Sequence, residues 1–238
     1  MRAADSNVGN AGAWSGSKPT ANSSWYEAAK FANWLTTGNA YAGAYQFDSG
    51  GVLTAVNRAA AVSAYGTVYV LPTENEWYKA AYLKSDGSDY TLYATGNSIP
   101  TAGTGGENYN GVIVGAWNVG SGTTSSIENN GTFDMSGNIW EWNESALDGT
   151  LNNMAEARLF RGGSSVNSGD NLRSSNRYGY YPTSEHYLVG FRIAVIPEPS
   201  TVSLLGLGAV SGILLRRRDK IAHVKRSPLS CDKCAGYW

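Results

Sequence analysis

The spacing of apolar residues predicts an amphipathic helix near the start of the chain. Ser24 precedes this segment and Glu27 follows three residues later, a pair that forms a capping box at a helix N-terminus. Gly38 is suited to end the helix. One apolar stripe is formed by Ala28, Phe31, Ala32 and Leu35. We therefore expect the segment between Ser24 and Gly38 to be a helix packed against the core.

Shorter apolar patterns predict strands and a second helix. The segments expected to be strands are Thr67–Leu71, Ala157–Arg161 and Val189–Val195. Thr73 and Glu76 form a second capping box, which opens a helix from Glu74 to Leu83. Residues 39–66 have no strong periodicity and are expected to be a loop, with a short helix near Val56–Ala64.

A long polar stretch lies between the second helix and the middle of the chain. Residues 85–130 are mostly Gly, Ser, Thr and Asn. A loop of this length in a compact domain is expected to be functional or locally held in place. A cation bound near Asn108–Asn110 is one way to hold it, and a plain mobile loop is the other.

One stretch just past the middle combines two carboxylates, two tryptophans and a glycine. Asp134 and Glu141 supply hard oxygen ligands, and Gly137 can adopt a positive φ. A turn here can therefore aim carbonyl and carboxylate oxygens at one Ca²⁺ ion. The alternative is an ordinary β-turn, with Trp140 and Trp142 in the core and the acids in water. These residues alone leave both interpretations open.

Four arginines recur in otherwise apolar segments: Arg161, Arg173, Arg177 and Arg192. They can hold carboxylates such as Glu141 or Glu76 in a buried network, or they can grip an anionic ligand. We favour the buried network.

Composition favours an extracytoplasmic, loop-rich protein. The 238 residues carry a net charge of −1, so there is no basic field for nucleic acid. Aromatic residues make up 12% and charged residues only 16%. The only cysteines, Cys231 and Cys234, lie near the C-terminus, so the rest of the chain has no disulfide, thiolate site or cysteine nucleophile. Their spacing suits half a zinc site or a redox pair, but without further ligands we expect residues 219–238 to be a disordered tail.

The two ends of the chain bear on export. Residues 1–22 lack the apolar segment of a signal peptide, and we expect a flexible or truncated N-terminal segment. Near the other end, Pro197-Glu198-Pro199 leads into an apolar run, 202–215, and then Arg216–Arg218. This order over residues 196–218 resembles the bacterial PEP-CTERM sorting signal. The resemblance implies an exported protein of the cell envelope or extracellular space. An exosortase would handle it, and it would be anchored in the membrane by the apolar run until the tail is cleaved.

Four separated segments together resemble the formylglycine-generating enzyme (sulfatase-modifying factor) family. In order they are Ser24–Ala28 with Trp34, Leu71–Trp77, Asp134–Trp142, and Arg161–Ser164 continuing through Arg173-Ser174 to Gly190–Arg192. The resemblance covers residues 23–195. It implies a single α+β domain with an irregular, loop-rich C-type-lectin-like fold, few helices and short antiparallel strands.

The resemblance also implies a calcium site. In the family the ion takes a side chain at the position of Asp134, carbonyl oxygens at those of Gly137 and Ile139, and a carboxylate at that of Glu141, and all four are suitably filled here. A second family calcium site begins at an Asn-x pair comparable with Asn108-Tyr109, but its acidic partner is not obvious, so that site is left open.

The family's catalytic residues are missing. Its copper-dependent oxidases use a cysteine pair shortly after the Arg-Gly-Gly-Ser motif, and residues 165–177 contain no cysteine. Its iron-dependent sulfoxide synthases need several histidines, and this domain has only His186. We therefore expect no catalytic residue, copper or iron, and calcium is the one predicted cofactor.

Two functions follow from these features. The first is an exported, non-catalytic, calcium-stabilised module whose aromatic loops bind an exopolysaccharide, a glycan or an envelope protein. The alternative is a formylglycine-generating-type or related metal-dependent oxidase that acts on an exported protein through a non-standard site. Its clustered candidates are Asp170, Tyr181, Glu185 and His186. A purely structural role in an extracellular matrix cannot be separated from the first function by sequence.

Overall fold

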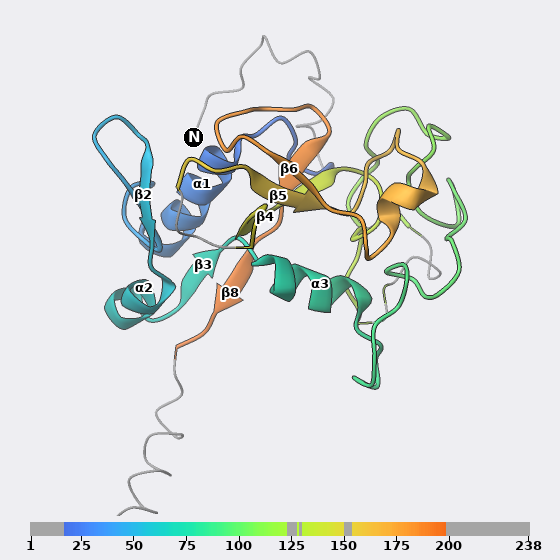
Figure 1. The fold of residues 1–238 in the computed structure, drawn as a ribbon, viewed down its shortest axis with the longest axis horizontal. Helices are drawn as coiled ribbons and strands as arrows, with labels where there is room; N and C mark the ends of the chain where they lie inside the picture. The colour runs from blue at the N-terminus through green and yellow to red at the C-terminus, as the bar shows by residue number, and fades with distance from the viewer. Residues whose placement is uncertain (1–16, 123–127, 129, 150–153, 199–238) are drawn as a thin grey trace, which may run out of the picture. The chain divides into compact units, whose positions relative to one another are not determined.

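The computed structural model describes residues 17–122, 128, 130–149 and 154–198 (Figure 1). The chain divides into two compact units, residues 1–197 and 198–238, and every described helix and strand belongs to the first. The predicted tail 219–238, the sorting signal beyond Glu198 and residues 1–16 of the N-terminal segment lie outside the described residues. Within the described end of that segment, Ala21 forms an isolated antiparallel bridge with Gly190.

The described part contains three α-helices and one 3₁₀-helix. They are α1 (Trp25–Thr37), α2 (Arg58–Tyr65), α3 (Glu74–Tyr82) and η2 (Gly169–Leu172). Both predicted capping boxes are confirmed, because Ser24 and Thr73 accept from the backbone of Glu27 and Glu76, whose side chains bind the caps in return. Local hydrogen bonds at the helix start are visible in the sequence, which is why these two elements were predictable.

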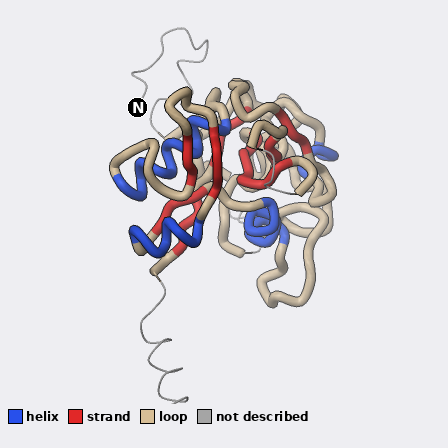
Figure 2. The backbone as a smooth tube through the Cα atoms, turned by 60° about the vertical axis from the view of Figure 1, so that its left-hand side comes forward, coloured by secondary structure: helices blue, strands red, loops and turns tan. Residues whose placement is uncertain are grey.

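Eight short strands of the described residues form three small sheets, and loops make up much of the remainder (Figure 2). The antiparallel pairs are β1 (Tyr45–Phe47) with β2 (Leu53–Val56), and β3 (Val68–Val70) with β8 (Ala194–Ile196). The third sheet has the order β6 (Tyr178–Tyr180), β5 (Arg158–Arg161), β4 (Trp140–Ala146) and β7 (Val189–Phe191), with β7 parallel to β4. This is the predicted irregular α+β arrangement.

Two predictions about elements were wrong in detail. Val189–Val195 is not one strand, because β7 pairs with β4 and β8 pairs with β3 in a different sheet. Between them Arg192 turns its side chain to the carboxylate of Glu141. The segment 39–66 is not all loop, since β1 and β2 lie within it, although the short helix expected there is present as α2.

An aromatic row crosses the four-stranded sheet and organises the main core. It is formed by Tyr178, Phe160, Trp142 and Phe191, which lie opposite one another in register on β6, β5, β4 and β7. Directly paired residues share a face of the sheet, so these four side chains lie on the same side. Ring centroids of Trp142 and Phe160 are 5.3 Å apart and those of Phe160 and Tyr178 are 6.2 Å apart.

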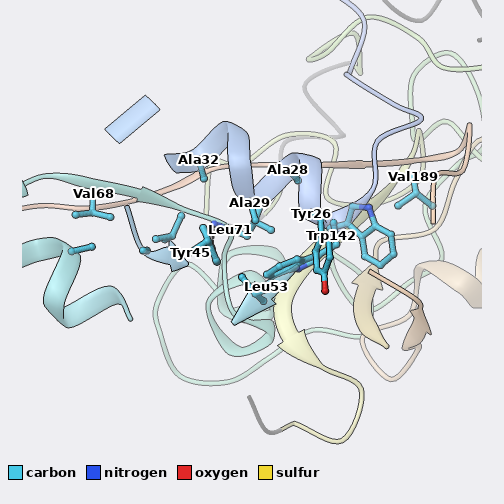
Figure 3. Close-up of a cluster of buried hydrophobic side chains, with 14 of the residues drawn as sticks. Tyr26, Ala28, Ala29, Ala32, Tyr45, Leu53, Val68, Leu71, Trp142 and Val189 are labelled. Carbon is cyan, nitrogen blue, oxygen red and sulfur yellow. Dashed lines mark hydrogen bonds between the residues drawn. The ribbon is translucent and has the colours of Figure 1, made fainter. Parts of the chain in front are cut away.

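Helix α1 covers this core with small residues. Ala28, Ala29 and Ala32 are completely buried and lie on the helix above Tyr45 and Leu71 (Figure 3). The indole nitrogen of Trp142 donates to the carbonyl of Ser23, 2.9 Å away, just before the helix begins. The alanines therefore let the helix approach the strands closely, while the bond from Trp142 fixes its N-terminal end.

Candidate functional site

The predicted calcium turn is a tightly bonded junction. Gly137 has a φ of +76°, and a Cβ there would lie 2.4 Å from the carbonyl oxygen of Asn108, so a larger residue does not fit. The nitrogen of Gly137 donates to the carbonyl of Gly162, and that of Asn138 donates to the carbonyl of Asn108. The turn thereby joins the Arg-Gly-Gly-Ser segment to the long polar loop.

Asp134 begins the turn and uses its carboxylate as an acceptor for that loop. Its φ of +57° lies in the left-handed region, which Asp and Asn tolerate better than most residues. Its Oδ1 accepts from the indole nitrogen of Trp117 at 3.2 Å, and its Oδ2 accepts from the backbone nitrogen of Gly120 at 2.6 Å. Asp134 therefore holds residues 117–120 against the turn.

Glu141 lies on the opposite side of the sheet from the aromatic row and is almost fully buried. Both of its carboxylate oxygens accept from the guanidinium of Arg192, and one also accepts from the indole nitrogen of Trp77 at 2.6 Å. Arg192 further donates to the carbonyls of Phe133 and Asp134, at 3.2 Å and 3.4 Å. The positively charged guanidinium of Arg192 thus binds oxygen atoms from both ends of the turn.

The two carboxylates among the predicted calcium residues are engaged in hydrogen bonds. Every carboxylate oxygen of Asp134 and Glu141 already accepts a hydrogen bond from a nitrogen donor. Among the described residues, no group of three His, Cys, Asp or Glu side chains is placed to hold a metal ion. Calcium bound by Asp134, Gly137, Ile139 and Glu141 stays a prediction.

Two of the four recurring arginines, Arg161 and Arg192, pair with largely buried glutamates, as the favoured interpretation predicted. Glu74, at the start of α3, accepts from Arg161 and from Arg177, with nitrogen–oxygen distances of 2.8 Å and 2.6 Å at its Oε1. Arg161 also donates to the carbonyls of Ser174 and Asn176. Arg173, by contrast, makes only an exposed pair with Asp170 in this network. The pairs connect α3 to the sheet on the side away from α1.

The Glu74 pair predicts loss of stability in acid. Burial alone would raise the pKa of Glu74, but hydrogen bonds from Arg177 and Arg161 outweigh it and lower the pKa below its usual 4.5. The pair therefore contributes stability that is present above pH 4.5 and is lost as the pH falls through the folded-state pKa. We expect the free energy of unfolding to fall in acid for the wild type and to fall less for Glu74→Gln. Urea denaturation at about pH 7 and about pH 3 measures both, and equal losses would contradict the assignment.

A second network lies at the other end of β4. The hydroxyl of Tyr45 donates to Glu144 at 2.7 Å, and Arg58 bridges Glu144 and Glu76. Burial raises the pKa of Glu144, with the charge of Arg58 acting in the opposite direction. These contacts tie α2, α3 and β4 together and serve the scaffold rather than a ligand.

The candidates for a non-standard catalytic site have separate partners. Asp170 pairs with Arg173, and Glu185 accepts from the side chain of Asn22. The ring of His186 stacks on that of Tyr187 at 4.8 Å, and Tyr181 is 67% exposed. Asp170, Glu185 and His186 thus each interact with a different neighbour.

Four exposed tyrosines follow the Arg-Gly-Gly-Ser segment, and we call them the tyrosine surface. They are Tyr178, Tyr180, Tyr181 and Tyr187, with exposed fractions of 46%, 52%, 67% and 52%. Tyr178 and Tyr180 alternate along β6 and so point to the same side of the strand. The Tyr178 ring rests 5.1 Å from Trp140, and the Tyr180 and Tyr181 rings are 6.1 Å apart. The Tyr178 ring therefore packs on the core, whereas Tyr180 and Tyr181 contact each other.

Sequence reasoning missed two buried glutamates in the long loop. Glu107 is 0% exposed and Glu128 is 2% exposed. Both lie among Gly, Ser, Thr and Asn residues, so no periodicity marked them as internal. The available signal was that they are the only glutamates in residues 85–130.

Comparison with known proteins identifies the family. Residues 4–196 match the sulfatase-modifying factor enzyme 1-like domain, and the chain therefore belongs to this family. Residues 195–218 match the PEP-CTERM protein-sorting motif, which implies export through the exosortase system and a C-terminus anchored in the membrane. Both resemblances found in the sequence are thus confirmed. Among the described helices, none is long and apolar enough to cross a bilayer.

Solved structures give the same fold. Treponema denticola variable protein 1 is 20% identical over 77% of this chain and 72% of its own, with a TM-score of 0.50. CarF is 24% identical over 77% of this chain and 69% of its own, with a TM-score of 0.54. At these identities the likeness concerns the fold alone, an irregular α+β, C-type-lectin-like fold. No curated protein matches the chain.

Proposed function

We propose that this exported protein is a non-catalytic binding module that presents the tyrosine surface to a glycan of the cell envelope or its exopolysaccharide. The observation that carries the proposal is the exposure of Tyr178, Tyr180, Tyr181 and Tyr187 in one ten-residue stretch. Exposed large aromatic side chains grouped together mark interaction sites more often than isolated ones.

The chemistry of tyrosine suits a saccharide. Its ring offers a flat apolar face to the C–H groups of a sugar, and its hydroxyl exchanges hydrogen bonds with sugar hydroxyls. Tyrosine has few rotatable bonds, so little conformational entropy is lost when it is held by a ligand. Packing of Tyr178 against Trp140 and Phe160 supports a preformed platform. An envelope protein is the other class of partner, and the screen below separates it from a glycan.

The calcium component of the proposal rests on the chemistry of the four predicted positions. Asp134, Gly137, Ile139 and Glu141 supply two carboxylates and two carbonyl oxygens, the donor types that Ca²⁺ prefers. Binding there would require Asp134 and Glu141 to share their oxygens with the ion as well as with their present donors.

A glycan array followed by calorimetry tests the binding role. We expect the wild-type domain to bind at least one polysaccharide class, and Tyr180→Ala to weaken the affinity about tenfold through loss of about 1.4 kcal/mol of ring contact. Tyr65→Ala is the matched control, because Tyr65 lies on α2 and is 47% exposed against 52% for Tyr180. Equal effects of the two substitutions, or no binding on the array, would reject the proposal.

A further inference from the structure

Glu107 and Glu128 are brought to the same place by the turn that follows them. The backbone nitrogen of Met135 donates to Oε1 of Glu128 at 2.7 Å. The neighbour of Glu107, Asn108, accepts from the backbone nitrogen of Asn138 at 2.7 Å. Glu128 is thus bonded to residues 135–138 directly and Glu107 is held beside them through Asn108, although the two glutamates are far apart in the loop.

The backbone around Glu107 holds its side chain inside. Its nitrogen donates to the carbonyl of Thr101 at 2.8 Å, and its own carbonyl accepts from Gly103 at 2.9 Å. The preceding residue, Gly106, has no room for a side chain, since a Cβ would lie 1.9 Å from the carbonyl oxygen of Thr101. The carboxylate cannot reach water without dismantling this part of the loop.

The carboxylate oxygens inside this region lack hydrogen-bond partners. Neither oxygen of Glu107 has one, and Glu128 has a partner for Oε1 but none for Oε2. The hydroxyl of Ser136, which follows the Met135 donor, is also buried without a partner. Buried polar groups are rarely left in this state, because each unsatisfied group costs free energy and an unpaired charge costs far more.

The charges facing the pair do not neutralise it. Burial, followed by the charges of Glu128 and Asp134, raises the pKa of Glu107 to about 9. Burial raises the pKa of Glu128 to about 8, although the hydrogen bond from Met135 and, to a smaller extent, the charge of Arg192 act in the opposite direction. The guanidinium of Arg192 is already engaged by Glu141, so a positive charge is missing from this side of the turn.

We propose that Glu107 and Glu128 together bind a hard divalent cation of the Ca²⁺ type, with the Ser136 hydroxyl as a further oxygen ligand. Carboxylate and hydroxyl oxygens in a water-poor site are the donors that such ions select. The set differs from Asp134, Gly137, Ile139 and Glu141, and it does not depend on the glycan-binding role. The cation would hold the long loop against the turn and the Arg-Gly-Gly-Ser segment.

Calcium titration of the metal-free domain tests the site. We expect isothermal calorimetry to detect binding, and the melting temperature to rise by about 5 °C or more at a calcium concentration a hundredfold above the Kd. The double variant Glu107→Gln/Glu128→Gln should fold, because the amides have nearly the same shape without charge. We expect it to lose this binding and the calcium-dependent rise.

Asp134→Asn is the matched control, since Asn also tolerates the left-handed backbone of that position. It removes the negative charge of Asp134 from the predicted turn site but leaves Glu107 and Glu128 intact, and we expect it to retain the calcium-dependent rise. Retention of binding in the double Gln variant with loss in Asp134→Asn would assign the ion to the turn and overturn the proposal. Absence of any calcium or magnesium binding in the wild type would also overturn it and would leave a shared proton as the neutralising partner.

Discussion

Replacing Arg192 with methionine is expected to lower the free energy of unfolding by about 3 kcal/mol, because it leaves the buried carboxylate of Glu141 without its counter-ion. The side chain of Glu141 is 8% exposed, and only the indole of Trp77 would remain to bind it. The substitution also frees the carbonyls of Phe133 and Asp134, which Arg192 holds at the start of the turn. Equilibrium urea denaturation measures the loss.

Two further variants make the Arg192 result interpretable. Arg173 pairs with Asp170 at the surface, where the two side chains are 46% and 81% exposed. Arg173→Met should therefore lower the free energy of unfolding by less than about 1 kcal/mol. Adding Glu141→Gln to Arg192→Met removes the stranded charge and should recover part of the loss. If Arg192→Met lowers the free energy of unfolding no more than Arg173→Met does, the turn does not depend on the guanidinium of Arg192.

Truncating Trp142 to alanine is expected to cost about 3–5 kcal/mol, the range for a large aromatic side chain removed from a packed core. Trp142 is 1% exposed and occupies the middle of the aromatic row, with Phe160 on one neighbouring strand and Phe191 on the other. Its loss would open a cavity below α1 and remove the bond that its indole nitrogen makes to Ser23. Thermal and urea denaturation would both report the change.

Trp34→Ala is the control for this substitution, because Trp34 is on α1 itself but is 45% exposed. Its cost should be well under half that of Trp142→Ala, since most of its surface already meets water. Trp142→Phe keeps one ring in the core but removes the indole donor and part of the ring volume, so its cost should lie between those of Trp34→Ala and Trp142→Ala. Similar costs for Trp34→Ala and Trp142→Ala would mean that the aromatic row is not the centre of the core.

Elements set by interactions between residues close in sequence could be predicted, whereas elements set by distant partners could not. Capping boxes act over three residues, so α1 and α3 were predicted with nearly their observed bounds. The division of residues 189–196 between two sheets depends on partners in β3 and β4, which are more than 45 residues away, and alternation alone cannot show it.

The candidate site was only partly predictable for the same reason. The family motifs identified the turn and the arginines that surround it, but the partner of each arginine is set by tertiary packing. Glu74 rather than Glu76 receives Arg161 and Arg177, because Glu76 turns back to cap its own helix and to bind Arg58. Burial of Glu107 and Glu128 arises from loop backbone that has no sequence periodicity, so their isolation from water emerged only in three dimensions.

The place of β8 has a mechanical consequence for a protein tethered by its C-terminal end. Strand β8 ends at Ile196, immediately before Pro197, so tension on that end reaches the Val68–Ile196 pair first and the two preceding pairs next. Arg192 is clamped to Glu141 behind those pairs. Under such tension the pairing of β3 with β8 can therefore break first, before the force reaches the rest of the domain.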